Sequence, residues 1–335
     1  MNSRVAVVGA GSWGTTLANL LAEKDLPVSL WCFESDLAAR MQATGINDLY
    51  LPGISLSANL QITNDLGRAV SGAGFVVYVT PSQVTRQVLR QSIKDLAEDA
   101  IIVSASKGIE NDSLLLLSQV FDQELPLALR QRVVFLSGPS FAREVSQHMP
   151  TAVVAAGYRS AIAEAVQQLF STPVFRVYTH QDIIGVELGG AMKNVIALAA
   201  GVADGLGFGH NTRAALITRG LAEMTRMGLK LGASQETFAG LAGMGDLVLT
   251  CTGDLSRNRS VGIELGRGRS LEEILEGMNM IAEGVKTTLS AYQLAEKMEV
   301  DVPIIEQTYQ ILYQNKDPRQ AVTDLMLRDL KAEKI

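Results

Sequence analysis

Short apolar runs alternate with helical stretches over the first half of the chain. Each run is rich in Val, Ile and Phe, ends in a turn of Gly, Pro or Ser, and is followed by a segment with helical spacing. Several runs are continuously apolar, which is typical of strands in a parallel sheet that helices cover on both faces. The predicted strands are Arg4–Val8, Pro27–Trp31, Phe75–Val79, Ile101–Ser104, Val133–Leu136, Ala152–Ala155 and Val174–Tyr178.

The pattern changes after about residue 180. From Gln181 onwards only helical periodicity is visible, and glycine turns interrupt it. We therefore expect an α/β domain with a mostly parallel sheet over residues 1–180 and an all-α domain over residues 181–335. A chain of 335 residues is long enough for two domains that each bury a core.

A glycine-rich loop joins the first predicted strand to the first helical run. Gly9, Gly11 and Gly14 form a GxGxxG pattern directly after the strand. In such a loop the first glycine allows a tight turn, the second lets a pyrophosphate approach the backbone, and the third lets the helix pack on the strand. The context predicts a Rossmann-type, dinucleotide-binding domain for residues 1–180. A tight turn without a ligand is the alternative.

An acidic residue lies at the end of the second predicted strand. Glu34 stands about 20 positions after the glycine loop, where the fingerprint places a carboxylate that binds the adenosine ribose. A basic residue, which would suit a 2′-phosphate, is not found beside it. The alternative is an ordinary solvated surface glutamate.

Composition narrows the class of protein. The formal net charge is −6, with 29 Lys and Arg against 35 Asp and Glu, which argues against a nucleic-acid partner. No apolar run reaches the roughly 18 residues of a membrane span, and no signal peptide is visible. The 2 cysteines form no CxxC pair, and the 3 histidines lack metal-ligand spacing. We expect a cytoplasmic protein with no metal and no stable membrane insertion.

With histidine scarce, lysine is the first candidate for proton transfer. Lys193 lies in an apolar, small-residue helix, in one stripe with Ala197, Ala200 and Asp204. Because lysine is rarely buried without a partner, we predict that Lys193 serves a reacting carbonyl or alcohol. A lysine that snorkels from a packing helix is the alternative.

Further polar residues stand where ligands bind in parallel sheets, past the carboxyl ends of strands. Lys107 follows the fourth predicted strand, and Ser140 follows the fifth. The alternative for Ser140 is a turn that Pro139 stiffens. In the second half, Asp246 and Thr250 are four residues apart and would share one face of a helix.

Two basic clusters stand out in this acidic chain. In Ser-Arg-Asn-Arg, residues 256–259, a planar guanidinium beside an amide suits phosphate or carboxylate recognition. A solvated basic turn is the alternative. Together with Arg267-Gly268-Arg269, this cluster indicates a ligand smaller than nucleic acid.

In chain order, these motifs resemble the bacterial NAD(P)-dependent glycerol-3-phosphate dehydrogenase family. The resemblance covers essentially the whole chain and implies interconversion of sn-glycerol 3-phosphate and glycerone phosphate with NADP(H) or NAD(H), supplying glycerol 3-phosphate for phospholipid synthesis. It also implies a homodimer formed by the helical half. The motifs that carry it are residues 9–15, 106–110 and 138–142, Lys193-Asn194, and residues 243–247 and 256–259.

The resemblance also implies site residues, with Lys193 as proton donor and acceptor. We expect Asp246 to hold the Lys193 ammonium and Lys107 to ease release of its proton. The implied substrate-binding residues are Lys107, Gly138, Ser140, Lys193, Asp246, Ser256, Arg257 and Asn258. The implied coenzyme contacts are Gly9, Gly11, Ser12, Trp13, Gly14, Phe33, Tyr50, Lys107, Ala142, Arg257, Ile281 and Glu283. The family often carries His or Arg near position 33, so Phe33 leaves the coenzyme preference open.

Two other functions fit part of the pattern. A dehydrogenase for a β-hydroxyacid or ketopantoate would share the glycine loop and a helical lysine, but Arg257-Asn258 favours a phosphorylated substrate. A dinucleotide-binding sensor without turnover would have no need of a paired lysine and aspartate. Oxidation of NADPH on addition of glycerone phosphate separates an enzyme from a sensor.

Overall fold

The computed structural model describes residues 4–278, 282–330 and 332–333. The chain divides into two compact units, one of residues 1–106 and 117–183 and the other of residues 107–116 and 184–335. Residues 107–116 belong to the second unit, although the sequence pattern, with its change near residue 180, gives no sign of this. They do so because Ile109 and Leu116 pack in one apolar core with Leu188 and Met192.

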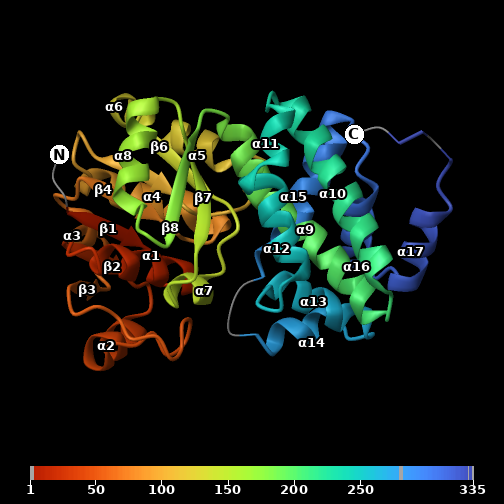
Figure 1. The fold of residues 1–335 in the computed structure, drawn as a ribbon, viewed down its shortest axis with the longest axis horizontal. Coiled ribbons are helices and arrows are strands. Elements are labelled where there is room, and N and C mark those ends of the chain that lie inside the picture. The colour runs from red at the N-terminus through yellow and green to blue at the C-terminus, as the bar shows by residue number, and fades with distance from the viewer. Residues whose placement is uncertain (1–3, 279–281, 331, 334–335) are drawn as a thin grey trace. The chain divides into compact units, whose positions relative to one another are not determined.

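The first unit is built on an eight-stranded sheet with the order β3-β2-β1-β4-β5-β6-β7-β8 (Figure 1). Neighbouring strands are parallel except for β6 and β7, which confirms the mostly parallel sheet. The strands are β1 Val5–Val8, β2 Val28–Trp31, β3 Leu60–Thr63, β4 Phe75–Tyr78, β5 Ile101–Ser104, β6 Val133–Ser137, β7 Thr151–Gly157 and β8 Phe175–His180.

Helices cover both faces of this sheet. Val77 and Tyr78 are adjacent in β4 and therefore point to opposite faces. Val77 shares a core with Leu17 of α1, whereas the Tyr78 ring packs edge-on against Phe121 of α5, with centroids 5.6 Å apart. The helices of this unit are α1 Ser12–Ala22, α2 Ser35–Thr44, α3 Leu66–Val70, α4 Ser82–Ser92, the 3₁₀ turn η1 Ile93–Asp95, α5 Leu117–Glu124, α6 Leu127–Arg130, α7 Ala142–Ser146 and α8 Ser160–Phe170.

Strand β3 was not predicted. It lies at the edge of the sheet, where Leu60 is buried, Gln61 is exposed and the next two residues are half-buried. An edge strand needs no continuous apolar run, so its four residues do not stand out from a loop. The seven strands that were predicted are present, and their ends differ from the predicted ones by up to two residues.

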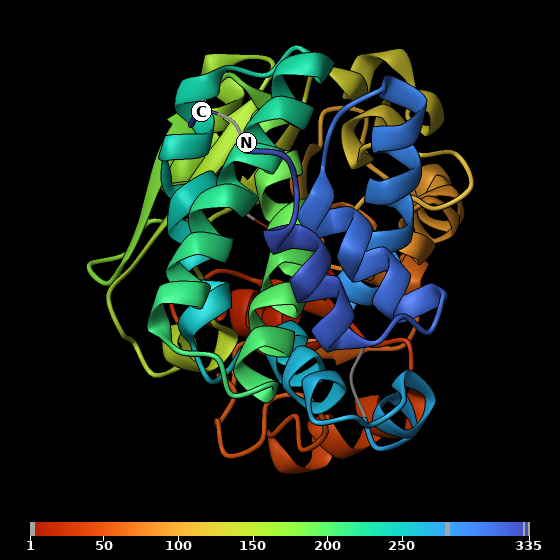
Figure 2. The same ribbon diagram turned by 90° about the vertical axis from the view of Figure 1, so that its right-hand side faces the viewer.

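The second unit is helical, and its helices run from green to blue in Figure 2. In the part of the chain that the structure describes, no strand follows β8, as predicted. Helix α9 is long and apolar enough to cross a membrane, but 83% of its most apolar window is buried inside the protein, so it is a core helix. The helices are α9 Ile183–Gly205, α10 His210–Leu231, α11 Gln235–Ala239, the π-helical turn η2 Leu241–Gly245, α12 Asp246–Thr252, α13 Arg257–Gly266, α14 Leu271–Glu276, α15 Glu283–Met298, α16 Pro303–Tyr313 and α17 Pro318–Met326.

Candidate active site

The glycine loop has the geometry that its sequence predicts. Gly9 has a φ of 117°, and a Cβ atom there would lie 2.7 Å from the carbonyl oxygen of Val79. A Cβ atom on Gly14 would lie 1.8 Å from the carbonyl oxygen of Gly9, so α1 can begin at Ser12 only with glycine at this position. Nothing lies within 4 Å of a Cβ on Gly11, which leaves this backbone open.

A buried asparagine stabilises this loop by hydrogen bonds. The side-chain amide of Asn47 is fully buried and donates hydrogen bonds of 2.8 Å to the carbonyl of Ala10 and to the hydroxyl of Thr15. Asn47 was not predicted as a site residue, because it lies 37 residues from Ala10 and in no recognisable motif. Its burial is the signal that identifies it, since a buried amide without partners would destabilise the fold.

Two aromatic residues accompany Glu34 just past β2. The hydroxyl of Tyr50 donates a hydrogen bond of 2.8 Å to Glu34. Burial, which is the larger cause, and the Glu34 carboxylate together raise the pKa of Tyr50 to about 12. Phe33 is 77% exposed and packs edge-on against Trp31. An acidic group and an exposed ring therefore lie at the carboxyl end of β2, where the fingerprint expects an adenosine.

The turn after β6 is linked to α1. Gly138 has a φ of 136°, and the Ser140 hydroxyl donates a hydrogen bond of 2.9 Å to its carbonyl. The carbonyl of Ala142, the first residue of α7, accepts a hydrogen bond of 3.2 Å from Thr16. Trp13 is half-buried, and its indole N–H finds no hydrogen-bond partner among the residues described. This donor lies in the first turn of α1, which begins directly after the open backbone of Gly11.

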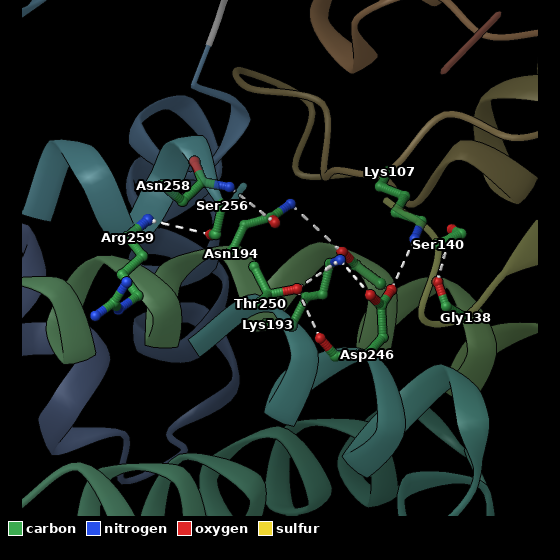
Figure 3. Close-up of polar contacts among 11 residues, drawn as sticks. Lys107, Gly138, Ser140, Lys193, Asn194, Asp246, Thr250, Ser256, Asn258 and Arg259 are labelled. Atoms are coloured by element: carbon green, nitrogen blue, oxygen red, sulfur yellow. Dashed lines mark hydrogen bonds and ion pairs between the residues drawn. The ribbon is translucent and has the colours of Figure 1, made fainter. Parts of the chain in front are cut away.

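Helix α9 presents Lys193 to an acidic residue of α12 (Figure 3). Lys193 is 7% exposed, and its ammonium donates hydrogen bonds to Asp246 and, at 2.9 Å, to the hydroxyl of Thr250. The other carboxylate oxygen of Asp246 accepts a hydrogen bond of 2.7 Å from Lys107. Because α12 is a helix, Asp246 and Thr250 share one face, as predicted. Thr250 was noticed in the sequence but given no role.

The surroundings of Lys193 shift its proton equilibrium. Burial lowers the pKa of Lys193 to about 8, with Asp246 acting to raise it and Lys107 to lower it further. The expected opposition of Asp246 and Lys107 is present, but burial is the largest cause. A group with a pKa near 8 exists both as ammonium and as amine at physiological pH, so it can donate and accept protons.

A π-helical turn places Asp246 against α9. Residues 241–245 form this turn immediately before α12. A Cβ atom on Gly189 of α9 would lie 2.4 Å from the carbonyl oxygen of Ala242, and one on Gly243 would lie 2.2 Å from that of Phe238. Glycine at these positions therefore allows the backbone contact that brings the Asp246 carboxylate to Lys193.

The predicted anion-binding segment opens α13. Ser256 caps this helix, and its hydroxyl accepts a hydrogen bond of 3.3 Å from the backbone N–H of Arg259. The Asn258 amide donates to Asn194 of α9 at 2.9 Å (Figure 3). Its oxygen accepts a hydrogen bond of 2.9 Å from the backbone N–H of Gly284. Asn194, the residue after Lys193, had no role in the prediction, and its bond to Asn258 joins α9 to the anion-binding segment.

Arg257 and Glu283 begin two helices of the second unit, α13 and α15. Neighbouring atoms that displace water lower the pKa of Arg257, and the negative charge of Glu283 opposes this effect. Ile281 lies outside the described residues. The basic cluster at residues 267–269 does not form an open anion site, because Arg267 and Arg269 both bind Glu264 at 2.7 and 3.1 Å.

The predicted residues fall into two groups. The glycine loop, Phe33, Tyr50, Gly138, Ser140 and Ala142 belong to the first unit, and Lys107, Lys193, Asp246, Ser256, Arg257, Asn258 and Glu283 belong to the second. Over the described ranges, no group of three or more His, Cys, Asp or Glu residues could hold a metal ion.

Comparison with protein families gives two adjoining matches. Residues 4–163 match the N-terminus of NAD-dependent glycerol-3-phosphate dehydrogenase, and residues 182–323 match its C-terminus.

Individual relatives agree with these matches. A glycerol-3-phosphate dehydrogenase [NAD(P)+] of Syntrophotalea carbinolica is 61% identical over 98% of this chain and 99% of its own length. That of Geobacter sulfurreducens is 61% identical over the whole of both chains. The crystal structure of glycerol-3-phosphate dehydrogenase from Coxiella burnetii is 41% identical and has a TM-score of 0.93, covering 97% of this chain and 99% of that one.

Proposed function

Because the chain belongs to the NAD-dependent glycerol-3-phosphate dehydrogenase family, we propose that Lys193, Asp246 and Lys107 carry the proton transfer of its reaction. The protein is an NAD(P)-dependent oxidoreductase that interconverts sn-glycerol 3-phosphate and glycerone phosphate. The proposal rests on one observation, the binding of the Lys193 and Lys107 ammonium groups to the two oxygens of Asp246.

Bound NAD(P)H supplies the hydride for the carbonyl carbon of glycerone phosphate. As negative charge develops on the carbonyl oxygen, the Lys193 ammonium donates a proton to it. In the opposite direction the neutral Lys193 amine accepts the proton of the alcohol. Asp246 orients the ammonium and stabilises its charge, and Lys107 shares that carboxylate, so Lys193 is held less strongly in its charged form.

The phosphate of the substrate is bound, in this proposal, at the start of α13. A helix N-terminus offers free backbone N–H groups and a partial positive charge, and Arg257 adds a planar guanidinium. Asn258 is fixed by its bonds to Asn194 and Gly284 and retains a second amide hydrogen for an anion. Ser256, Gly138 and Ser140 complete the proposed substrate contacts.

The first unit fits a dinucleotide. The open backbone at Gly11 and the indole N–H of Trp13 offer donors to phosphate oxygens, and Glu34 offers a carboxylate to a ribose hydroxyl. The other proposed coenzyme contacts are Gly9, Ser12, Gly14, Phe33, Tyr50, Lys107, Ala142, Arg257, Ile281 and Glu283. Most of the proposed coenzyme contacts thus lie in residues 1–180, and most of the proposed substrate contacts lie in residues 181–335.

The biological setting is part of the same proposal. We place the enzyme in the cytoplasm as a homodimer that supplies glycerol 3-phosphate for phospholipid synthesis. Light scattering on the purified protein tests the dimer, and a single-chain mass at micromolar concentration would exclude it.

The reaction itself is tested by following oxidation of NADH and of NADPH by the purified protein. We expect rapid oxidation with glycerone phosphate, slow oxidation with dihydroxyacetone, which lacks the phosphate, and none with ketopantoate. A faster rate with ketopantoate than with glycerone phosphate would overturn the assignment of Arg257 and Asn258 to a substrate phosphate.

A further inference from the structure

One carboxylate near the end of α9 binds two arginines. The Asp204 side chain is 9% exposed, and one of its oxygens accepts hydrogen bonds from Arg213 of α10 at 2.6 and 3.0 Å. Its other oxygen accepts a hydrogen bond of 2.8 Å from Arg259 of α13. The activity described above assigns no role to this cluster, although α9 and α13 carry its central residues.

Arg259 links the start of α13 to α9. Its backbone N–H binds the capping hydroxyl of Ser256, while its guanidinium reaches Asp204. The preceding residue, Asn258, binds Asn194. The first turn of α13 is therefore attached to α9 at Asn194 and Asp204, which are about 15 Å apart along the helix at 1.5 Å per residue.

Four glycines bring the two helix backbones into contact. A Cβ atom on Gly201 would lie 2.1 Å from the carbonyl oxygen of Arg259, and one on Gly262 would lie 2.2 Å from that of Leu198. Gly205 and Gly266 repeat the contact one turn later, with 2.2 and 2.3 Å to the facing carbonyl oxygens. Since these contacts fix the distance between the helices, the polar bonds at the start of α13 decide how its first turn is oriented.

We propose that Asp204 is a positioning residue for the substrate phosphate. It acts through Arg259, whose bond to Asp204 holds the first turn of α13 so that Arg257 and the adjacent backbone N–H groups face the phosphate. The inference rests on the proposed function, in which Arg257 and Asn258 bind that group. Arg259 pairs with Asp204 and, at 3.0 Å, with the exposed Asp254, so its guanidinium is bound to carboxylates and does not serve as a substrate ligand in this proposal.

Arg213 provides a matched control within the same cluster. It binds the same carboxylate as Arg259, but it lies on α10, which carries none of the proposed substrate ligands. A role in stability alone would make both arginines equivalent. If Asp204 is a positioning residue, replacement of Arg259 impairs use of the substrate phosphate, whereas replacement of Arg213 does not.

The test compares kcat/KM for glycerone phosphate with kcat/KM for dihydroxyacetone. We expect Asp204→Asn and Arg259→Gln each to lower this ratio by about tenfold, because charge-assisted bonds that orient the phosphate site are weakened. The double variant should lower it no further, since both changes break one link. Arg213→Gln should leave the ratio at the wild-type value.

The outcomes separate this inference from the proposed function. If Arg257→Lys lowers the ratio and Asp204→Asn does not, the inference is wrong and the phosphate site stands. An unchanged ratio in Arg257→Lys would remove the phosphate site itself. Equal losses with both substrates in Asp204→Asn would make Asp204 a structural residue only. If Asp204→Asn does not fold, Arg259→Lys, which keeps the charge but not the planar group, decides the question by the same ratio.

Discussion

Lys193 donates a hydrogen bond to Asp246, a residue with no exposed surface. The same carboxylate also binds Lys107 at 2.7 Å, so one buried negative charge faces two ammonium groups. Asp246 raises the pKa of Lys193 and Lys107 lowers it, so both neighbours act on the proton equilibrium of Lys193. Removal of any member therefore changes proton transfer as well as charge.

Replacement of Lys193 by Met keeps the aliphatic stem and removes the proton. We expect kcat for glycerone phosphate to fall by about 10²–10⁴-fold or more, because both proton transfer and the charge near the developing alkoxide are lost. The Kd for NADH, measured by fluorescence, should stay the same. Lys230→Met at an exposed position of α10 is the matched control and should behave as wild type. Retention of more than about a tenth of kcat in Lys193→Met would exclude a role in the reaction.

The rate should depend on pH through Lys193, whose pKa is lowered to about 8. Reduction needs the ammonium, so its kcat/KM should fall as the pH rises through this value, whereas that of oxidation should rise. Because Asp246 raises the pKa of Lys193, Asp246→Asn should move the falling limb to lower pH. Profiles of kcat/KM against pH measure the shift, with the exposed Asp329→Asn as control. An unmoved limb in Asp246→Asn would contradict the assignment.

The phosphate site is tested by Arg257→Lys, which keeps the charge but loses the planar fork. We expect kcat/KM for glycerone phosphate to decrease, by an amount that corresponds to the loss of about 1.5–3 kcal/mol of transition-state stabilisation. The slow reaction of dihydroxyacetone should scarcely change, since it has no phosphate to lose. Equal damage to both substrates would mean that Arg257 acts only through the fold or its proposed coenzyme contact, and not through the substrate phosphate.

Glu34 should limit the preference for NADPH, because a 2′-phosphate would meet its carboxylate. We expect kcat/KM for NADPH to exceed that for NADH by less than about three orders of magnitude, or roughly 4 kcal/mol. Glu34→Gln should shift the ratio towards NADPH, and the exposed Glu98→Gln should not. A larger preference in the wild type would show that this carboxylate does not face the ribose.

A buried acid elsewhere makes stability depend on pH. Glu223 accepts hydrogen bonds from the backbone N–H groups of Ile304 and Ile305, at 2.7 and 3.1 Å, and burial raises its pKa to about 7 from 4.5. The folded state therefore binds more protons than the unfolded state between these values, so the stability from Glu223 is present below pH 4.5 and is lost as the pH rises through 7.

This loss should reach about 3 kcal/mol in the wild type. It should be smaller in Glu223→Gln, which cannot ionise. Urea unfolding at pH values on either side of the window measures the difference, with the exposed Glu236→Gln as control. A wild type and a Glu223→Gln variant with the same pH dependence would mean that Glu223 keeps an ordinary pKa.

The features visible in the sequence are those encoded by adjacent residues. The glycine loop, the central strands and the shared face of Asp246 and Thr250 depend on short-range spacing, and all of these predictions are confirmed. Strand β3 was missed because an edge strand tolerates Gln61 and similar polar residues. The antiparallel direction of β7 leaves no mark in its own apolar pattern.

Spacing along the chain does not by itself reveal contacts between distant residues: the Lys193–Asp246 contact was expected only beside the family resemblance, and the Asn194–Asn258 contact was not expected. Lys193 and Asp246 are separated by 53 residues, and Asn194 and Asn258 by 64, so only the packing of α9 against α12 and α13 brings them together. Arg267 shows the opposite case, in which the sequence indicates a site that the structure does not form. The basic cluster around Arg267 indicates an anion site in the sequence, but Arg267 forms an ion pair with the nearby Glu264. Local composition could not distinguish an open cation from a paired one.

The assignment of residues 107–116 to the helical unit affects how the protein is made. This segment leaves the ribosome well before the helices against which Ile109 and Leu116 pack. Once residue 183 has emerged, the first unit is complete, but it carries this apolar loop exposed until the remaining residues are synthesised. Exposed apolar surface on a nascent chain favours aggregation and binds chaperones. A recombinant first unit that ends at residue 183 therefore needs a short polar linker in place of residues 107–116.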